Sequence, residues 1–288
     1  MSFLIGMDIG GTNIRIGLYS IKNKSIIDYA TKTLVKYDVV NVEVEQNICM
    51  LIKERMQQHF LEMDRLKGIG ISIAANFERS TGNLTRWPNN PKWNGFPLRE
   101  YLTQYFRVPV VIEDDANSAA LGEYICQSKV KDNLLYCTLG TGIGMGIIIN
   151  KRIYCGDNHI AGEIGHMRIR DNRLNCVCGK TGCLQAFLRK KDNTCESKRI
   201  FQYNSNYMCK LTSELAYCLY QIAYLFDISL TIIGGGVVEY DEEFYRKVEK
   251  FFFEYVGDNA EIYKIRKSEL YNRNGIYGIL KLIADAVK

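Results

Sequence analysis

Two short glycine-rich turns in this sequence carry residue types that bind phosphate. Their residues are Asp8, Gly10, Gly11 and Thr12 in the first turn and Gly140, Thr141 and Gly142 in the second. Glycine lets a ligand approach the backbone closely, and successive N–H groups then form an anion-binding nest. Thr12 adds a hydroxyl donor, and Asp8 is placed to hold a hydrated Mg²⁺ beside the phosphates. One such turn could be a simple hairpin, but two of them favour a nucleotide.

The two turns differ from the common nucleotide fingerprints. Neither is followed by the GK[ST] of a Walker loop, and each leads into an expected strand, whereas a dinucleotide fingerprint leads into a helix. A third turn, with Gly234 and Gly235, closes an apolar run and could lie against an adenosine. Glycines are common at strand ends, so this third turn is informative only beside the other two.

An acidic run, Glu113-Asp114-Asp115-Ala116-Asn117, follows an expected strand and opens an expected helix. Asp and Asn are good helix N-caps, which is a purely structural explanation for such residues and the favoured one for Glu113. A carboxylate at this turn can also act as a general base toward an attacking hydroxyl, as phosphoryl transfer requires. Both explanations stay open for Asp115.

Three clustered cysteines predict a metal site. Cys176, Cys178 and Cys183 lie close together, and His166 precedes them. Three thiolates and one imidazole are ligands that tetrahedral Zn²⁺ prefers, and four protein ligands leave no open position for water. We therefore expect a structural zinc ion that holds His166 in place. The other seven of the ten cysteines lack such spacing and are expected to be ordinary thiols.

Hydrophobic periodicity predicts the elements that position these residues. Strands are expected at residues 3–8, 14–18, 25–35, 68–74, 108–112, 134–139, 145–149 and 230–233. Helices are expected at residues 41–66, from 97, after 115, and at 212–226, 241–255 and 273–287. Two strand–glycine turn–strand hairpins, at 4–18 and 134–149, indicate a duplicated α/β unit.

Composition narrows the class of protein. The 288 residues are 47% hydrophobic and 24% charged, which excludes disordered and fibrous classes. A net charge of +5 is too small to indicate nucleic acid as the main partner. The chain shows no signal peptide and no long apolar run, so we expect a cytoplasmic protein, with no membrane partner, whose thiols stay reduced.

Six motifs occur in a fixed order: DIGGT at 8–12, EDDAN at 113–117, LGTGIG at 139–144, AGEIGH at 161–166, CVCGKTGC at 176–183 and IIGGGV at 232–237. Their order resembles the ROK family of sugar kinases and repressors, within the actin/hexokinase-like ATPase superfamily. The CxCGxxGC element after ExGH is the most specific part. The resemblance implies two actin-like (ribonuclease H-like) α/β domains, with sugar and ATP in the cleft between them. We place the domains at 1–116, joined by 273–288, and at 117–272.

The resemblance also assigns roles to residues. Asp115 would be the general base that takes the proton from the sugar's primary hydroxyl. The expected sugar contacts are Asn90, Asp114, Glu163, His166 and Gln185. Asp114 stands where the family more often has Asn, and Gln185 stands where it usually has Glu. The neighbouring Asn89 is an alternative to Asn90, while Trp87 and Trp93 are either sugar platforms or loop packing.

The activity implied is ATP- and Mg²⁺-dependent phosphorylation of a hexose at its 6-hydroxyl, with glucose as the first choice and a homodimer as the expected assembly. Fructose, allose, mannose and N-acetylmannosamine remain open as substrates. A sugar-responsive regulator is the alternative, but ROK repressors carry a winged helix-turn-helix domain ahead of DIGGT, and only seven residues precede Asp8. A nucleic-acid-binding zinc module would need a second ligand pair and a strongly basic face.

Overall fold

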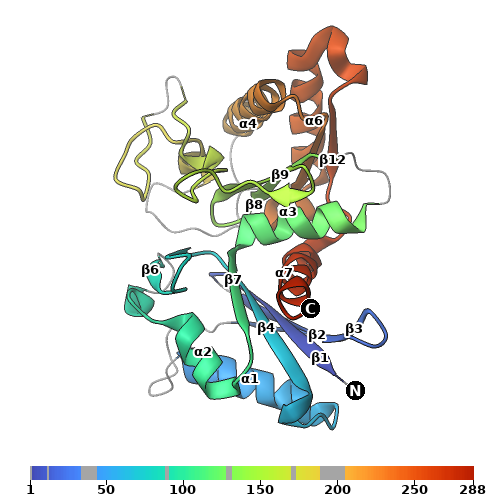
Figure 1. Ribbon diagram of the computed structural model, residues 1–288. Helices are drawn as coiled ribbons and strands as arrows, with labels where there is room; N and C mark the ends of the chain where they lie inside the picture. The colour runs from blue at the N-terminus through green and yellow to red at the C-terminus, as the bar shows by residue number, and fades with distance from the viewer. Residues whose placement is uncertain are drawn as a thin grey trace. The chain divides into compact units, whose positions relative to one another are not determined.

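The computed structural model describes residues 2–11, 13–33, 44–87, 91–127, 132–169, 173–188 and 205–288. The chain forms two compact units, the first from Met1–Gly122 together with Gly275–Lys288, and the second from Glu123–Asn274. Each unit contains one five-stranded sheet with helices packed on it (Figure 1). The predicted α/β fold class is confirmed, while the domain bounds placed from the sequence stay a prediction.

The sheet of unit 1 has the strand order β3-β2-β1-β4-β7. Its strands are β1 (Phe3–Ile9), β2 (Asn13–Ser20), β3 (Ser25–Thr33), β4 (Leu66–Ile73) and β7 (Val110–Asp114). The β1–β2 and β2–β3 pairs are antiparallel, whereas β1–β4 and β4–β7 are parallel. The carboxyl ends of β1, β4 and β7 therefore meet at one edge, where the chain carries Asp8, Ser72 and Asp114.

Helices cover both faces of this sheet. The helices α1 (Val44–Gln58) and α2 (Leu98–Phe106) share one hydrophobic core with the sheet. The other face receives α7 (Asn274–Ala286), whose Ile276, Leu280 and Ile283 form a second apolar cluster with Leu4 (Figure 1). This helix packs on strand glycines, because a Cβ on Gly70 would lie 2.8 Å from side-chain and backbone atoms of Ile279. The sheet face is thus shaped to accept the C-terminal helix closely.

The sheet of unit 2 repeats the arrangement of unit 1, with the order β10-β9-β8-β11-β12. Its strands are β8 (Leu134–Leu139), β9 (Ile143–Ile149), β10 (Arg152–Ile153), β11 (Leu230–Gly234) and β12 (Lys264–Lys267). Again the first three form antiparallel pairs and the last two join in parallel. The helices α4 (Ser205–Phe226), α5 (Gly236–Tyr240) and α6 (Glu242–Val256) complete its core. The duplication expected from the two glycine hairpins is confirmed.

Shorter elements complete the described chain. The helix α3 (Asp115–Cys126) follows β7, and a small hairpin pairs β5 (Asn76–Phe77) with β6 (Leu84–Arg86). Short 3₁₀ turns lie at Met63–Arg65, Pro91–Trp93, Ile164–His166, Leu184–Leu188, Gly257–Glu261 and Tyr271–Arg273. The helix expected at 41–66 ends at Gln58, because Phe60 adopts a left-handed φ of 53°. In the part of the chain that the structure describes, every helix is too short or too polar to cross a membrane.

Candidate functional site

The first glycine turn joins β1 to β2, and Asp8 lies at its entrance. Cross-strand neighbours hold this carboxylate: Arg15 Nη1 donates to Oδ2 at 2.9 Å, and Ser72 Oγ donates to Oδ1 at 3.0 Å. Asp8 is largely buried, with 13% of its side chain exposed. Since both oxygens already accept a hydrogen bond, this carboxylate is better placed to meet the water shell of a Mg²⁺ ion than to bind the ion directly. Thr12 lies outside the described residues.

Asp114 and Asp115 lie where β7 ends and α3 begins. Asp114 is the cap of this helix, because its Oδ1 accepts from the backbone N–H groups of Ala116 at 3.0 Å and Asn117 at 3.2 Å. Asp115 Oδ1 accepts the N–H of Ala116, at 2.9 Å, whereas the next N–H of the helix, that of Asn117, donates to Asp114. The capping explanation therefore fits Asp114, and the carboxylate of Asp115 is available for other chemistry.

Asp115 is in an environment that disfavours its charge. Burial, and then the negative charges of Asp114 and Asp8, raise the pKa of Asp115 well above its usual range. A raised pKa makes the ionised carboxylate a stronger base, which improves it as an acceptor of a hydroxyl proton. The structure thus brings three sequence-predicted residues of unit 1, Asp8, Asp114 and Asp115, into one acidic group.

An ion pair that no sequence motif indicates lies next to this acidic group. Glu113, only 5% exposed, receives a bidentate ion pair from Arg79, which lies between β5 and β6. Glu113 Oε1 also accepts from the N–H of Asp114 at 2.9 Å and from Asn117 Nδ2 at 3.1 Å. These bonds hold both ends of the turn that presents Asp115. Because Arg79 is distant in sequence and belongs to no motif, only a three-dimensional structure reveals it.

Replacing Arg79 by Met should destabilise unit 1. Removing the guanidinium leaves a buried carboxylate without its cation, which costs about 2–3 kcal/mol for a pair whose arginine is partly solvated. We expect the melting temperature to fall by roughly 5–10 °C, measured by differential scanning calorimetry. The matched control is Arg65→Met, since Arg65 and Asp64 are 51% and 65% exposed and such pairs contribute little. Equal melting temperatures for the two variants would contradict the structural role of Arg79.

In unit 2 the second and third glycine turns meet. A Cβ on Gly235 would lie 2.4 Å from the carbonyl oxygen of Leu139, and its φ of 92° is left-handed, so only glycine fits. Leu139 leads directly into Gly140, where no described atom lies within 4 Å of an added Cβ. The packing of the described residues therefore does not require glycine at position 140. Thr141 is exposed.

The AGEIGH segment packs beside the second glycine turn. Met145 N, on β9, donates to Gly162 O at 3.0 Å, and a Cβ on Gly162 would lie 1.9 Å from Met145 O. This close packing places Glu163 and His166 next to the β8–β9 hairpin. Glu163 is 57% exposed on its side chain, and its Oε2 lies 3.6 Å from His166 Nε2. An exposed carboxylate beside an imidazole suits recognition of hydroxyl groups.

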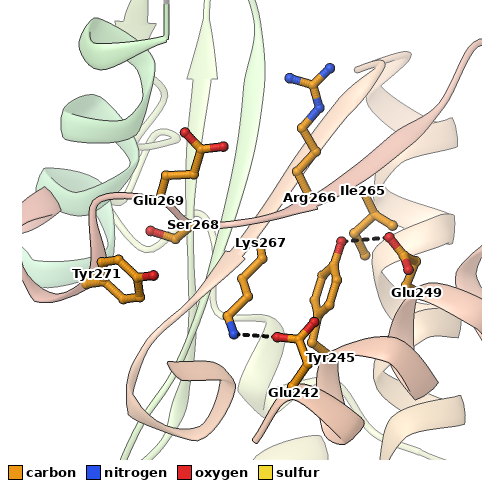
Figure 2. Close-up of a pocket in the computed structure, with 9 residues that line it drawn as sticks. All are labelled: Glu242, Tyr245, Glu249, Ile265, Arg266, Lys267, Ser268, Glu269 and Tyr271. Carbon is orange, nitrogen blue, oxygen red and sulfur yellow. Dashed lines mark hydrogen bonds and ion pairs between the residues drawn. The ribbon is translucent and has the colours of Figure 1, made fainter. Parts of the chain in front are cut away.

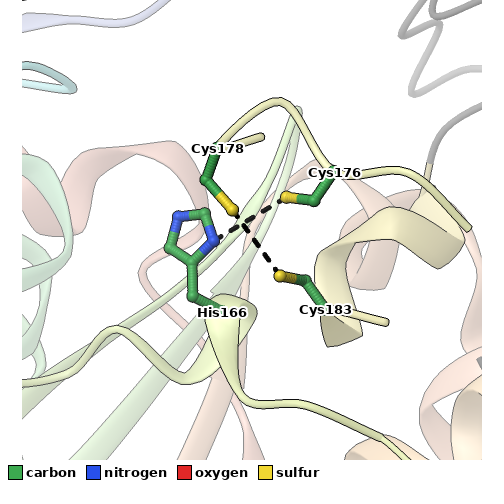
Figure 3. A group of neighbouring side chains, drawn as sticks. All are labelled: His166, Cys176, Cys178 and Cys183. Atoms are coloured by element: carbon green, nitrogen blue, oxygen red, sulfur yellow. Dashed lines mark hydrogen bonds between the residues drawn. The ribbon is translucent and has the colours of Figure 1, made fainter. Parts of the chain in front are cut away.

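His166, Cys176, Cys178 and Cys183 converge on one point (Figure 3). Their ligand atoms all lie within 4.8 Å of one another. Cys178 Sγ and Cys183 Sγ are 3.7 Å apart, as are Cys176 Sγ and His166 Nδ1. Tetrahedral Zn²⁺ with Zn–S bonds of about 2.3 Å separates its sulfur ligands by about 3.7 Å. The four side chains thus fit a structural zinc ion bound through Nδ1, which leaves Nε2 facing Glu163.

Gln185 lies against this cluster. Its Nε2 is 3.4 Å from Cys176 Sγ and 3.4 Å from His166 Nε2. Its Oε1 occupies the space beside Gly142, where an added Cβ would lie 3.0 Å away. Gln185 therefore lies between the predicted metal site and the second glycine turn.

Two aromatic residues of the predicted sugar loop are structural. Trp87 and Trp93 are 1% and 3% exposed, and their ring centroids are 4.8 Å apart. The structure therefore favours loop packing over the sugar-platform interpretation for both residues. Asn90 and its alternative Asn89 lie outside the described residues.

A separate open pocket of about 430 Å³ lies between α6 and β12 (Figure 2). Ion pairs and hydrogen bonds already engage several of its polar groups: Lys267 Nζ donates to Glu242 Oε2 at 2.8 Å, and Tyr245 Oη donates to Glu249 Oε1 at 2.7 Å. None of the site residues predicted from the sequence lines this pocket. We therefore assign it no part in the predicted chemistry.

Comparison with known proteins identifies relatives along the whole chain. The model of the ROK family matches residues 4–286. A glucokinase from Halalkalibacterium halodurans is 30% identical over 95% of this chain and 92% of its own length. A putative xylose repressor from a Caldicellulosiruptor species is also 30% identical, over 66% of this chain and 47% of its own length. A ROK family glucokinase from Streptomyces griseus, solved with glucose and AMPPNP, aligns with a TM-score of 0.79 and 25% identity over 99% of this chain and 100% of that one.

Proposed function

The chain belongs to the ROK family, and from this premise we propose that it is an ATP-dependent kinase that phosphorylates a hexose, with glucose as the first candidate. The observation that carries the proposal is the acidic turn at the start of α3, where Asp115 has a raised pKa and Asp114 takes the capping role. The glycine turns at the ends of β1 and β8 supply the complementary feature, a place for phosphate groups.

In the proposed reaction Asp115 acts as the general base. Its carboxylate takes the proton of the sugar's 6-hydroxyl as the oxygen attacks the γ-phosphorus of ATP. A P–O bond to the sugar forms, the P–O bond to the β-phosphate breaks, and ADP leaves with the bonding electrons. Positioning and charge neutralisation contribute most to such transfers, and the base adds a further factor of about 10²–10⁴.

The phosphate groups would be held mainly by backbone amides. Gly10, Gly11 and Thr12, and likewise Gly140, Thr141 and Gly142, are the proposed phosphate contacts, while Gly234 and Gly235 would contact the adenosine. Mg²⁺ bound with ATP supplies positive charge to the phosphates. Asp8, held by Arg15 and Ser72, would orient the water shell of that ion.

The sugar hydroxyls would be recognised by Asp114, Glu163, His166 and Gln185, together with Asn90. The exposure of Glu163 and its proximity to His166 support this assignment. A structural zinc ion held by His166, Cys176, Cys178 and Cys183 would keep the AGEIGH segment in place. Glucose is the first candidate because the relatives include glucokinases. Fructose, allose, mannose and N-acetylmannosamine are the alternatives, as is a non-catalytic sugar-responsive regulator, since repressors are also among the relatives.

A coupled assay of ADP release over a panel of these hexoses tests the proposal. We expect glucose to give the highest kcat/KM and the sugar 6-phosphate to form in equal amount to ADP. Turnover that no sugar stimulates, combined with sugar binding by calorimetry, would favour the regulator instead. The expected homodimer is checked on the same preparation by analytical ultracentrifugation.

Replacing Asp114 by Asn should shift the pH profile of the reaction. The carboxylate of Asp114 raises the pKa of Asp115, so removing that charge lowers this pKa. Because Asp115 must be ionised to accept a proton, activity falls as the pH drops through its pKa. The acid limb of the kcat/KM profile should therefore move to lower pH in the variant. Asn keeps the Oδ1 acceptor for the helix cap, so a drop in activity without a shift would contradict this coupling.

A further inference from the structure

One buried carboxyl group has no part in the proposed reaction. Glu123, on α3, is 0% exposed, and Ser268 Oγ donates a hydrogen bond to its Oε1. Asn274 Nδ2 lies 3.4 Å from the same oxygen. Among the described residues no hydrogen-bond partner is present for Oε2. Burial raises the pKa of Glu123.

The same amide links Glu123 to a buried tyrosine. Asn274 Nδ2 donates to Tyr136 Oη at 2.6 Å, and Tyr136, on β8, is 1% exposed. Burial raises the pKa of Tyr136 as well. Glu123, Ser268, Asn274 and Tyr136 thus form one buried polar cluster inside unit 2, in which each member orients the next.

The third glycine turn rests directly on this cluster. A Cβ on Gly234 would lie 2.5 Å from Tyr136 Oη and 3.0 Å from Ser268 Cβ. Ser268 N also donates to Ile233 O at 2.8 Å, which connects the cluster to the last residues of β11. Tyr136 and Ser268 therefore form the floor beneath the backbone of Gly234, and Gly235 follows it against Leu139.

We infer that Glu123 is a positioning residue for nucleotide binding, acting through Ser268, Asn274 and Tyr136 on the turn of Gly234 and Gly235. The inference rests on the proposed function, since it assumes that this turn contacts the adenosine of ATP. Without the Glu123 carboxyl, Ser268 loses its acceptor and Asn274 loses its contact with Oε1. The side chains of Ser268 and Tyr136 beneath the turn then become less ordered, and the proposed adenosine subsite is distorted.

Calorimetric titration of ADP with Mg²⁺ into Glu123→Ala and Glu123→Gln tests this inference. The Ala variant should bind ADP roughly 5- to 100-fold more weakly, as expected when buried hydrogen-bonding partners are left unpaired. The Gln variant keeps the Oε1 acceptor and should bind within about threefold of the unmodified protein. In kinetic assays the Ala variant should raise KM for ATP while KM for the sugar stays unchanged. If Glu123 had only a structural role, KM for ATP and KM for the sugar would both change, or neither would.

A second pair of variants tests the floor without removing Glu123. Gly234→Ala places a methyl group against Tyr136 Oη and should weaken ADP binding about tenfold or more. Adding Tyr136→Phe removes that oxygen and should restore roughly threefold or more of the lost affinity, which is coupling typical of residues in contact. If Gly234→Ala binds ADP normally, or the second change restores nothing, the inference is wrong.

ADP binding by the unmodified protein distinguishes a failure of the proposed nucleotide function from a failure of the role of Glu123. If it binds no ADP, the proposed nucleotide function fails and the role of Glu123 fails with it. If it binds ADP and Glu123→Ala binds equally well while remaining folded by circular dichroism, only the positioning role is rejected.

Discussion

Replacing Asp115 by Asn should lower kcat/KM for the preferred hexose about 1,000-fold, within the range of a lost general base. Asn has the same shape but cannot accept the hydroxyl proton at neutral pH. The affinity for ADP and the melting temperature should change little, because Asn keeps the oxygen that accepts the N–H of Ala116. The coupled assay and calorimetric titration of ADP provide these measurements.

Asp114→Asn is the matched control for this variant. It also removes one carboxylate from the same turn but leaves the proposed base in place. We expect its kcat/KM near its own pH optimum to stay within about tenfold of the unmodified protein, since the base is kept and only its pKa and one proposed sugar contact change. If Asp115→Asn retained a tenth or more of the activity, or if both variants lost equal amounts, Asp115 could not be the general base.

Replacing Cys183 by Ser should remove the metal and damage sugar recognition. The purified protein should contain about one zinc per chain, and the variant should contain close to none, because three ligands cannot hold a structural site of this kind tightly. The AGEIGH segment then loses its anchor at His166. A displacement of about 1 Å of Glu163 and His166 should reduce kcat/KM by about 100-fold. Elemental analysis and the coupled assay measure the two effects.

Cys209→Ser is the control, since Cys209 is an exposed cysteine on α4 outside the cluster. It should keep both the metal and the activity. The free thiol of Cys183 has its pKa raised to about 12, first by burial and then by the neighbouring cysteines. Its ionisation at neutral pH therefore depends on a cation, and zinc binding should release protons. A Cys183→Ser variant with full zinc content would contradict the proposed ligand set.

The sheets were predictable from the sequence where strands carry a local signal. In the β1–β2 and β8–β9 hairpins, short apolar runs precede the glycine turns, and β2 alternates apolar residues after its turn; both hairpins appear as predicted. In contrast, β12 consists of Lys264, Ile265, Arg266 and Lys267. Three charged residues out of four predict an exposed loop. It lies at the edge of its sheet, where charged side chains are common. Its strand conformation depends on parallel pairing with β11. The local sequence contains no pattern that predicts this pairing.

The residues of the candidate site also include some that local sequence predicts and some that it does not. The cysteine cluster was predictable because most of its ligands come from one short segment, so spacing alone places them together. The division of labour between Asp114 and Asp115 was not, because it depends on which carboxylate the helix N-terminus engages. Arg79 beneath Glu113, and Ser268 against Glu123, lie far from their partners in sequence. Such contacts arise from tertiary packing, so no periodic pattern in the sequence predicts them.

The packing of α7 on the glycine-bearing face of the first sheet also determines when unit 1 can be completed. Its sheet is encoded by residues 1–122, but the helix that covers one face comes from Gly275–Lys288. A ribosome must add residues 123–274 in between, which takes roughly 8–30 s at ordinary rates of synthesis. During that interval Leu4 and its neighbours lack their partners Ile276, Leu280 and Ile283. Unit 2 is whole before unit 1, so a chain arrested before α7 would present an open apolar sheet to chaperones and to other nascent chains.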